Sequence, residues 1–318
     1  MIWREPRDDE LISCLGVDSA RMGAEIVGHD RAKAAWKQLA ASRSFHSALV
    51  ETGMPIGGHR IVAFGASVFV SRLFADEEVV NPRPGLNARI IGSIVSGHPV
   101  VLNQAELRAA NTEGGLDLVV LCGHWRKGIL GAKEISEVQM LLASAFLDAH
   151  RGFRFNRLLT ENLDEVERRS YAEASGTWRI ISDFRDFHLK YPGTPWSRDR
   201  SLAVITAEEA FKVPGHITQM LFQYHEPVLR LQDANQQLLT SALTGLTDEE
   251  LARSLKLPLS AIKKRWRSLF EKASAHPSLF PDMCDGLGDA GRGRQKRQFI
   301  LTYVREHPEE LRPFKHTR

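Results

Sequence analysis

Cysteine is scarce in this sequence, and its spacing excludes the chemistry that clustered cysteines support. The 318 residues include three cysteines, Cys14, Cys122 and Cys284. They are odd in number, far apart and without the spacing of a metal site, so we expect neither a disulfide framework nor a cysteine-bound metal. Reduced thiols of this kind are typical of the cytoplasm, where we expect the protein to be located.

Long apolar runs are also missing. The sequence has no stretch of about 18 apolar residues, which is the minimum for a membrane-spanning helix. The first residues, MIWREPRDDELIS, carry acids where a signal peptide has its apolar core. We therefore expect neither a membrane partner nor secretion.

The sequence also lacks a large excess of positive or negative charge. Lysine and arginine number 42 and acids number 39, so the formal charge is only +3. The chain as a whole is no polycation, and a surface for nucleic acid would have to be a local concentration of charge. With 43% hydrophobic and 25% charged residues, the chain is typical of a folded protein and long enough for two domains.

One stretch, residues 231–272, has such a local concentration and a pattern of three short helices. Asp233 to Leu243 is amphipathic, and Gly245 follows it as a helix C-terminal glycine. Thr247 and Glu250 have the spacing of a capping box, which predicts the start of a second helix.

A third helix is predicted after Pro258, which cannot continue the second. Its apolar residues repeat at helical spacing and are Ile262, Trp266, Leu269 and Phe270. The opposite face carries Lys263, Lys264 and Arg267, and no acidic residue occurs from Lys256 to Leu269. Such a helix suits the major groove of DNA. The alternative is a solvated basic face in a bundle that binds another protein.

The stretch resembles the LuxR-type (GerE) DNA-binding domain, in which L-T-x-x-E-x-x-V-L, a glycine, E-I-A, a leucine and S-x-x-T-V-K precede a basic recognition helix. The residues in register are Leu231, Leu238, Leu239, Gly245, Glu250, Leu251, Ala252, Leu255, Ile262 and Lys263. The departures are Asn235, Pro258, Ala261 and Arg265, where the family usually has Glu, Ser, Thr and His.

This resemblance implies double-stranded DNA as the partner. By the family's geometry Lys263, Lys264 and Arg267 would face bases. Ser260, Arg265 and Lys272 would contact phosphates. A later basic run consists of Arg292, Arg294, Lys296 and Arg297, and it opens a predicted amphipathic helix, Gln295 to Arg305. This run is either a second phosphate contact or a solvated helix start.

The first 200 residues predict alternating strands and helices. The strands are expected at 61–70, 116–121, 153–159 and 178–181, and the helices at 11–17, 24–39, 86–95, 103–110, 135–149 and 164–174. This order is typical of a layered α/β domain. The segment 61–183 faintly resembles the GCN5-related acetyltransferase fold in its order of elements.

That resemblance implies an acyl-CoA site, for which the family uses Arg or Gln, two residues, Gly, one residue and Gly or Ala at a helix N-terminus. Here Arg126-Lys-Gly-Ile-Leu-Gly131 has the residue types at another spacing. We therefore expect a fold reused for sensing or subunit contacts, with no cofactor and no catalytic residue. An acyltransferase-like enzyme with a helix-turn-helix tail is the alternative.

Several isolated residues have a structural interpretation beside a functional one. Cys122 and His124 could form a nucleophile and base, but no third group orients them, so we expect a packed strand end. The acids that could bind a metal are Glu134 and Glu137, or Asp183 and Asp186 with His188; no second cluster completes a ligand set, so we expect no metal.

The overall prediction is an α+β chain: an α/β layered domain at 1–200, which faintly resembles the acyltransferase fold, a connector at 201–224, and an all-α LuxR-type domain at 225–318. We expect a transcriptional regulator whose first domain takes an unknown small-molecule input. We also expect a homodimer, because one module makes few base contacts. The apolar helix Ile135 to Ala149 would supply part of the interface, unless it is wholly buried within one subunit.

Overall fold

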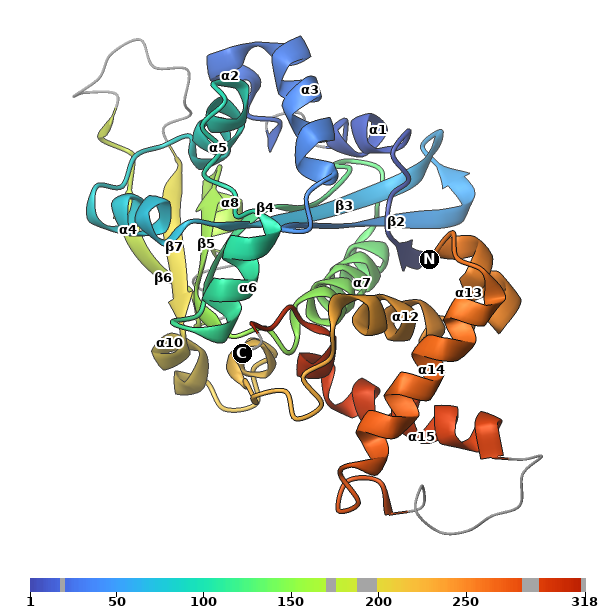
Figure 1. Cartoon of the computed structure of the whole chain (residues 1–318). Coiled ribbons are helices and arrows are strands. Elements are labelled where there is room, and N and C mark those ends of the chain that lie inside the picture. The colour runs from blue at the N-terminus through green and yellow to red at the C-terminus, as the bar shows by residue number, and fades with distance from the viewer. Residues whose placement is uncertain (18–20, 170–175, 188–198, 282–291, 316–318) are drawn as a thin grey trace. The chain divides into compact units, whose positions relative to one another are not determined.

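The computed structural model describes residues 1–17, 21–169, 176–187, 199–281 and 292–315 (Figure 1). The chain divides into two compact units. We call Met1–His150 with Arg154–Phe222 the α/β unit, and Arg151–Phe153 with Gln223–Arg318 the helical unit. No helix among the described ranges is both long and apolar enough to cross a membrane.

A mixed sheet of seven strands forms the centre of the α/β unit. The strands are β1 (Ile2–Arg4), β2 (Phe45–Ile56), β3 (His59–Val70), β4 (Leu116–Trp125), β5 (Phe155–Asn162), β6 (Arg179–Asp183) and β7 (Ser201–Thr206). Their order across the sheet is β1-β2-β3-β4-β5-β7-β6. Only the β4 and β5 pair is parallel among these pairings.

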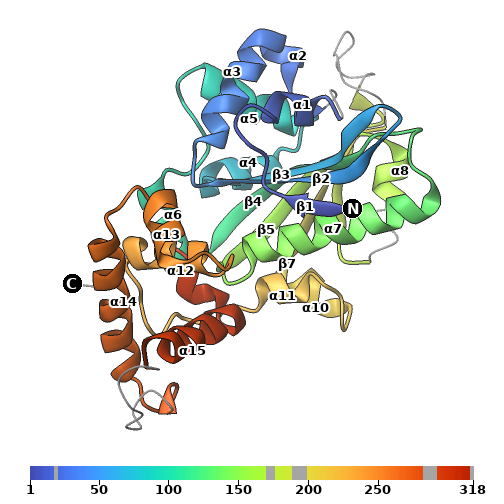
Figure 2. The ribbon, with the colours of Figure 1, turned by 90° about the vertical axis from the view of Figure 1, so that its right-hand side faces the viewer.

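Helices cover both faces of this sheet (Figure 2). One face is covered by α1 (Leu11–Leu15), α2 (Ala24–Val27), α3 (His29–Ala40) and α5 (Leu86–Val95), and the other by α7 (Ala132–His150), α10 (Ala207–Lys212) and α11 (Gln219–Phe222). Three further helices are α4 (Arg72–Val80), α6 (Gln104–Thr112) and α8 (Glu165–Glu167). The largest apolar core packs fully buried Trp36, Leu49 and Leu121 between the sheet and the first of these layers.

The described helical unit is built from helices. They are α12 (Asp233–Ala242), α13 (Asp248–Ser254), α14 (Leu259–Ser274), α15 (Arg292–Glu306) and the 3-10 helix η4 (Pro308–Leu311). Their core contains Leu238, Leu239, Leu251, Ile262 and Trp266, each at most 2% exposed. Burial of about 150–250 Å² by a tryptophan makes Trp266 the largest contributor to this core.

The helical unit also includes three residues that the chain contributes between α7 and β5. Gly152 has φ +83° and lies against η4, so close that a Cβ there would be 2.4 Å from the backbone nitrogen of Glu309. Nε of Arg312 donates to the carbonyl of Arg151 at 2.7 Å, and its guanidinium lies over Phe153. A unit confined to 225–318, as the sequence predicts, therefore omits part of its packing.

Much of the predicted secondary structure is confirmed. The strands expected at 61–70, 116–121 and 178–181 correspond to β3, β4 and β6, and the helix expected at 86–95 is α5. Three strands were not predicted: β1, β2 and β7. The expected connector at 201–224 is wrong at its start, because Ser201–Thr206 pairs with both β5 and β6 inside the sheet. The helix expected at 164–174 begins as α8 at Glu165, and residues 170–174 of that range lie outside the described residues.

Candidate nucleic-acid interface

The third predicted helix is α14, and it has one buried and one exposed face. Ile262, Trp266 and Leu269 are each at most 2% exposed and pack into the helical core. Lys263, Lys264 and Arg267 are exposed, as the sequence predicts. Burial of the first set fixes the rotation of the helix, so the three cations necessarily face away from the core.

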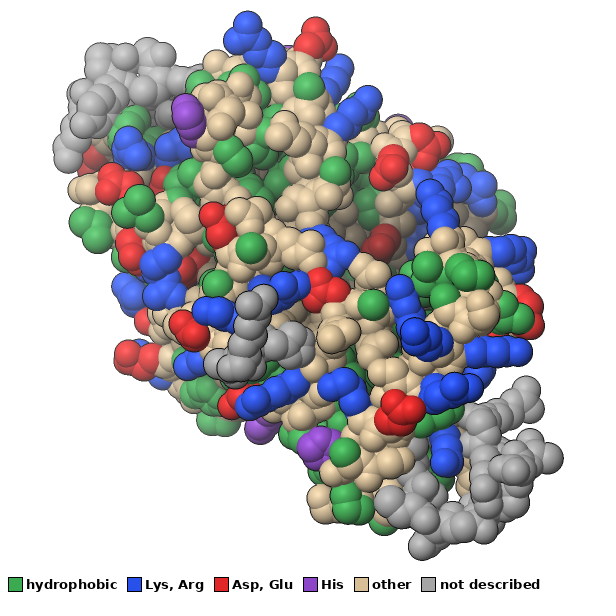
Figure 3. Space-filling model, in the orientation of Figure 1, with side chains coloured by type: hydrophobic (Ala, Val, Ile, Leu, Met, Phe, Trp, Pro, Cys, Tyr) green, Lys and Arg blue, Asp and Glu red, His purple; other side chains and the backbone are tan. Residues whose placement is uncertain are grey.

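These three cations have no competing partner within the part of the chain that the structure describes. The hydrogen bonds and ion pairs of the described residues include none from Lys263, Lys264 or Arg267. Figure 3 shows Lys and Arg side chains gathered over α13 and α14 with few acids among them. The ammonium and guanidinium groups are therefore available to an anionic ligand.

The turn between α13 and α14 sets where the exposed face begins. Leu255 caps α13, and the N–H of Leu257 donates to the carbonyl of Ala252 at 2.9 Å. Between them Lys256 has φ +52°, a left-handed conformation that costs a residue with a Cβ about 1–2 kcal/mol. Pro258 then caps α14 with extended backbone, as the sequence predicts.

The predicted capping box at the start of α13 is confirmed. The hydroxyl of Thr247 accepts from the N–H of Glu250 at 3.3 Å, and the Glu250 carboxylate accepts from the N–H of Thr247 at 2.7 Å. The hydrogen bonds that the Glu250 carboxylate accepts from the N–H and from the hydroxyl of Thr247 keep the Glu250 pKa below its usual range. Gly245, with φ +87°, ends the segment after α12 as expected.

Two of the residues expected at phosphates have partners inside the helical unit. Arg265 donates from Nη1 to the carbonyl of Ala234 at 3.0 Å, and Nζ of Lys272 lies 3.3 Å from the carbonyl of Leu229. Both side chains are half-buried. We assign them to holding α14 against α12 and the segment that precedes it, rather than to phosphates.

Arg297 is engaged more completely. Its guanidinium pairs with both carboxylate oxygens of Asp248 and lies 4.9 Å from the centre of the Trp266 ring. This ion pair ties α15 to the N-terminus of α13, so Arg297 is a structural residue. Lys296 is half-buried, and the side chains of Arg292 and Arg294 lie outside the described residues. Of the expected phosphate contacts, Ser260 is exposed on the same face as Lys263.

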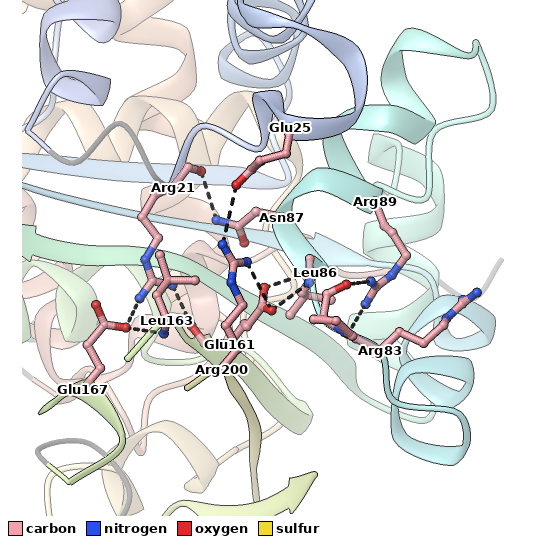
Figure 4. Close-up of polar contacts among 12 residues, drawn as sticks. Arg21, Glu25, Arg83, Leu86, Asn87, Arg89, Glu161, Leu163, Glu167 and Arg200 are labelled. Atoms are coloured by element: carbon pink, nitrogen blue, oxygen red, sulfur yellow. Dashed lines mark hydrogen bonds and ion pairs between the residues drawn. The ribbon is translucent and has the colours of Figure 1, made fainter. Parts of the chain in front are cut away.

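A second polar cluster, which the sequence did not predict, lies in the α/β unit where β4 and β5 part (Figure 4). The parallel pairing ends at Val120 and Thr160, although both strands continue. Beyond that point Asn87 donates from Nδ2 to the carbonyl of Leu121 at 2.9 Å. Nη1 of buried Arg21 donates to the carbonyl of Glu161 at 2.6 Å. Side chains thus replace the missing strand partners.

The charges in this cluster are paired among themselves. Arg21 forms an ion pair with Glu167, and Nη1 of Arg200 lies 3.4 Å from the carboxylate of Glu161. The same carboxylate accepts from the N–H groups of Gly85 and Leu86, at 2.7 and 2.9 Å, where α5 begins. A buried acid at a helix N-terminus is stabilised by the helix dipole. We interpret the cluster as structural, because its hydrogen bonds hold α5 against the sheet.

Cys122 and His124 lie beside this cluster, both buried. They line a small cavity together with Cys14 and Arg21. Burial, with the positive charges of Arg21 and Lys127, lowers the pKa of His124 to about 2, so the imidazole is neutral. A neutral, buried imidazole next to a buried thiol agrees with the packed strand end expected from the sequence.

The turn before α7 does not fit an acyl-CoA. Arg126 donates to the carbonyls of Ile61 and Gly16, at 3.0 and 3.2 Å, and is occupied there. Oε2 of Glu134 lies 2.7 Å from the position that a Cβ would take on Gly131. A carboxylate over the first turn of the helix repels the pyrophosphate that this position would have to bind. The turn 126–131 therefore does not supply such a site.

The acids considered for a metal are dispersed. Oε1 of Glu137 pairs with the N-terminal amine at 2.9 Å, and Asp183 pairs with Arg185. His188 lies outside the described residues. Elsewhere in the described ranges no group of three His, Cys, Asp or Glu side chains could hold a metal ion. Compared with protein-family models and with curated proteins, the chain matches none.

Proposed function

We propose that the chain is a sequence-specific DNA-binding transcriptional regulator, in which α12, α13 and α14 form a LuxR-type helix-turn-helix and α14 enters the major groove. The observation that carries the proposal is the exposed, unpaired set of Lys263, Lys264 and Arg267 opposite the buried stripe of α14. Cations at these positions meet phosphates or the acceptor edge of guanine.

The dimensions of α14 support this function. An α-helix with its side chains is about 10–12 Å across and the major groove is about 12 Å wide, so the 16-residue α14 can lie in the groove. The capping box of α13 and the bend at Lys256 hold α14 by its N-terminal end. In helix-turn-helix proteins the N-terminal residues of the second helix contact base edges.

The competing interpretation is an interaction protein whose basic helix binds an acidic partner. The two interpretations differ in salt-dependent affinity for duplex DNA and in the choice of one sequence over another. The test uses the full chain and measures fluorescence anisotropy with a site recovered by selection from random duplexes. We expect preference for the recovered site over scrambled DNA; equal, weak binding to both would favour the interaction protein.

A variant with three alanines, Lys263→Ala/Lys264→Ala/Arg267→Ala, should lose its specific affinity for the selected DNA site. Because all three side chains are exposed and alanine favours helix, the variant should fold, which circular dichroism checks. The matched control is Arg31→Ala/Lys33→Ala/Lys37→Ala in α3, which removes the same residue types from the α/β unit. If both variants bind as the parent does, α14 is not the interface.

A homodimer belongs to the same proposal, since two modules double the base contacts. Support comes from α7: of its apolar residues only Val138 and Ala145 are buried, and Met140 is 68% exposed. The helix is therefore not wholly buried within one chain. Light scattering should give twice the chain mass, and Met140→Glu should lower it. The control Gln139→Glu adds the same charge at the exposed neighbouring position; a monomeric parent protein would exclude the dimer.

A further inference from the structure

The exposed face of α14 carries mainly hydrogen-bond donors in its first turns. Ser260, Lys263, Lys264 and Arg267 stand at i, i+3, i+4 and i+7, which is a single helical face, and all four are exposed. Lysine and arginine are donors only, while the serine hydroxyl can donate or accept. We call these four residues the reading face.

The reading face matches one base better than the other three. Guanine presents two acceptors, N7 and O6, in the major groove, and arginine or lysine donates to both. Adenine calls for an amide that donates and accepts, cytosine for a carboxylate and thymine for an apolar side chain. The reading face contains none of these three. The nearest acid along the same side, Glu271, lies one turn beyond Arg267.

The axial length of the reading face limits how many bases it can cover. From residue 260 to residue 267 the helix rises about 10 Å at 1.5 Å per residue. Successive bases along one strand are about 3.4 Å apart, so this rise spans about three base pairs. Three cations over three base pairs leave room for each to reach a different guanine.

We infer that the half-site read by α14 contains at least two guanines within about three consecutive base pairs, contacted from the major groove by Lys263, Lys264 and Arg267. This inference rests on the proposed function and adds the base identity to it. Arg265 and Lys272 take no part, because both donate to backbone carbonyls of the helical unit.

The test replaces single guanines of the selected site. With 7-deazaguanine, which lacks the N7 acceptor and keeps O6, affinity of the full chain should fall about tenfold at each contacted position, because the bidentate contact loses one of its two acceptors. Inosine keeps N7 and O6 and lacks only the minor-groove amino group, so it should bind as guanine does. Loss with inosine and not with 7-deazaguanine would overturn major-groove reading.

A change of residue should change the base. Lys264→Asn should exchange the preference at one position from guanine to adenine, because an asparagine amide pairs with adenine N6 and N7. Lys264→Ala should abolish the preference at that position without creating another. A recovered site without guanine, bound with the expected salt dependence, would refute the inference and leave the DNA-binding function standing. Absence of specific DNA binding would refute both.

Discussion

Asp248 and Arg297 join two helices of the helical unit through a bidentate ion pair. Nη1 and Nη2 of Arg297 in α15 lie 2.9 and 2.7 Å from the two carboxylate oxygens of Asp248 at the start of α13. Nε1 of Trp266 in α14 donates to the same carboxylate at 3.2 Å. Three helices therefore meet at one carboxylate, and α14 is held by its largest buried side chain.

Arg297→Ala should therefore destabilise the helical unit by about 1–3 kcal/mol, since it leaves the carboxylate of Asp248 without its charged partner. Arg297→Lys should restore only part of the loss, because an ammonium cannot make the two parallel hydrogen bonds. Urea denaturation of the full chain measures the change. Arg305→Ala, at an exposed position of the same helix, is the control. Equal stability of both alanine variants would contradict the role given to Arg297.

Lys256→Gly should stabilise the turn before α14. Lys256 is exposed and has φ +52°, where glycine has no steric penalty, so we expect a gain of about 1 kcal/mol. Thermal denaturation reads the gain as a higher Tm. Lys256→Ala removes the charge and keeps the Cβ, so it should not reproduce the gain. If alanine and glycine act alike, charge and not backbone conformation determines the effect.

Gly152→Ala and Gly245→Ala should differ sharply, although both positions have φ above +80°. A Cβ at Gly152 would meet the backbone of Glu309 at 2.4 Å, whereas at Gly245 nothing lies within 4 Å. We expect a cost of about 1–2 kcal/mol at Gly245 from conformation alone. The cost at Gly152 should reach about 3 kcal/mol or more, because overpacking adds to it. Similar unfolding midpoints would mean that the segment 151–153 does not pack against η4.

Cys14 should resist alkylation in the folded protein. Burial raises the pKa of its thiol to about 12, so at pH 8 the reactive thiolate is suppressed. Mass spectrometry after brief iodoacetamide treatment should find Cys14 unmodified, and modified once urea is added. The same shift stabilises the fold below the ordinary thiol pKa near 9, and this stabilisation is lost as pH rises from there towards 12. Fast modification in the native state would contradict the burial.

Sequence patterns predict those elements that carry their own local signals. The helix Leu86–Val95 follows a proline and glycine loop and has apolar residues at helical spacing, and its bounds agree with the structure. The capping box at Thr247 and the exposed face of α14 with Lys263 can also be predicted from the sequence, because caps and amphipathic faces are defined within a few residues. What these exposed cations bind is not encoded locally, and it stays a proposal.

Long-range relations were beyond such reasoning. The strand Phe45–Ile56 contains Glu51, Gly53 and Pro55, which weaken its pattern. The sequence of β7, SLAVIT, is a short apolar run that fits a buried strand or a buried helix segment, and its two partners in the sheet decide between them. The pairing of Arg21 with Glu167 joins residues 146 positions apart. The sequence leaves Arg297 open between a phosphate contact and a solvated helix start, because its partner, Asp248, lies 49 residues away. Local periodicity in the sequence does not indicate ion pairs between residues so far apart.

The salt dependence of DNA affinity tests the central claim most directly. For the full chain on its selected duplex, log affinity should fall linearly with log salt, because lysines and arginines release counterions. In Lys263→Ala/Lys264→Ala/Arg267→Ala affinity should fall at every salt concentration; the slope should become less steep, by about 0.9 per cation, only where a lost cation also neutralises a phosphate, and a cation that contacts only guanine should leave it unchanged. The α3 control variant should keep the parent slope. Parallel lines of equal affinity for all three proteins would contradict binding of DNA through α14.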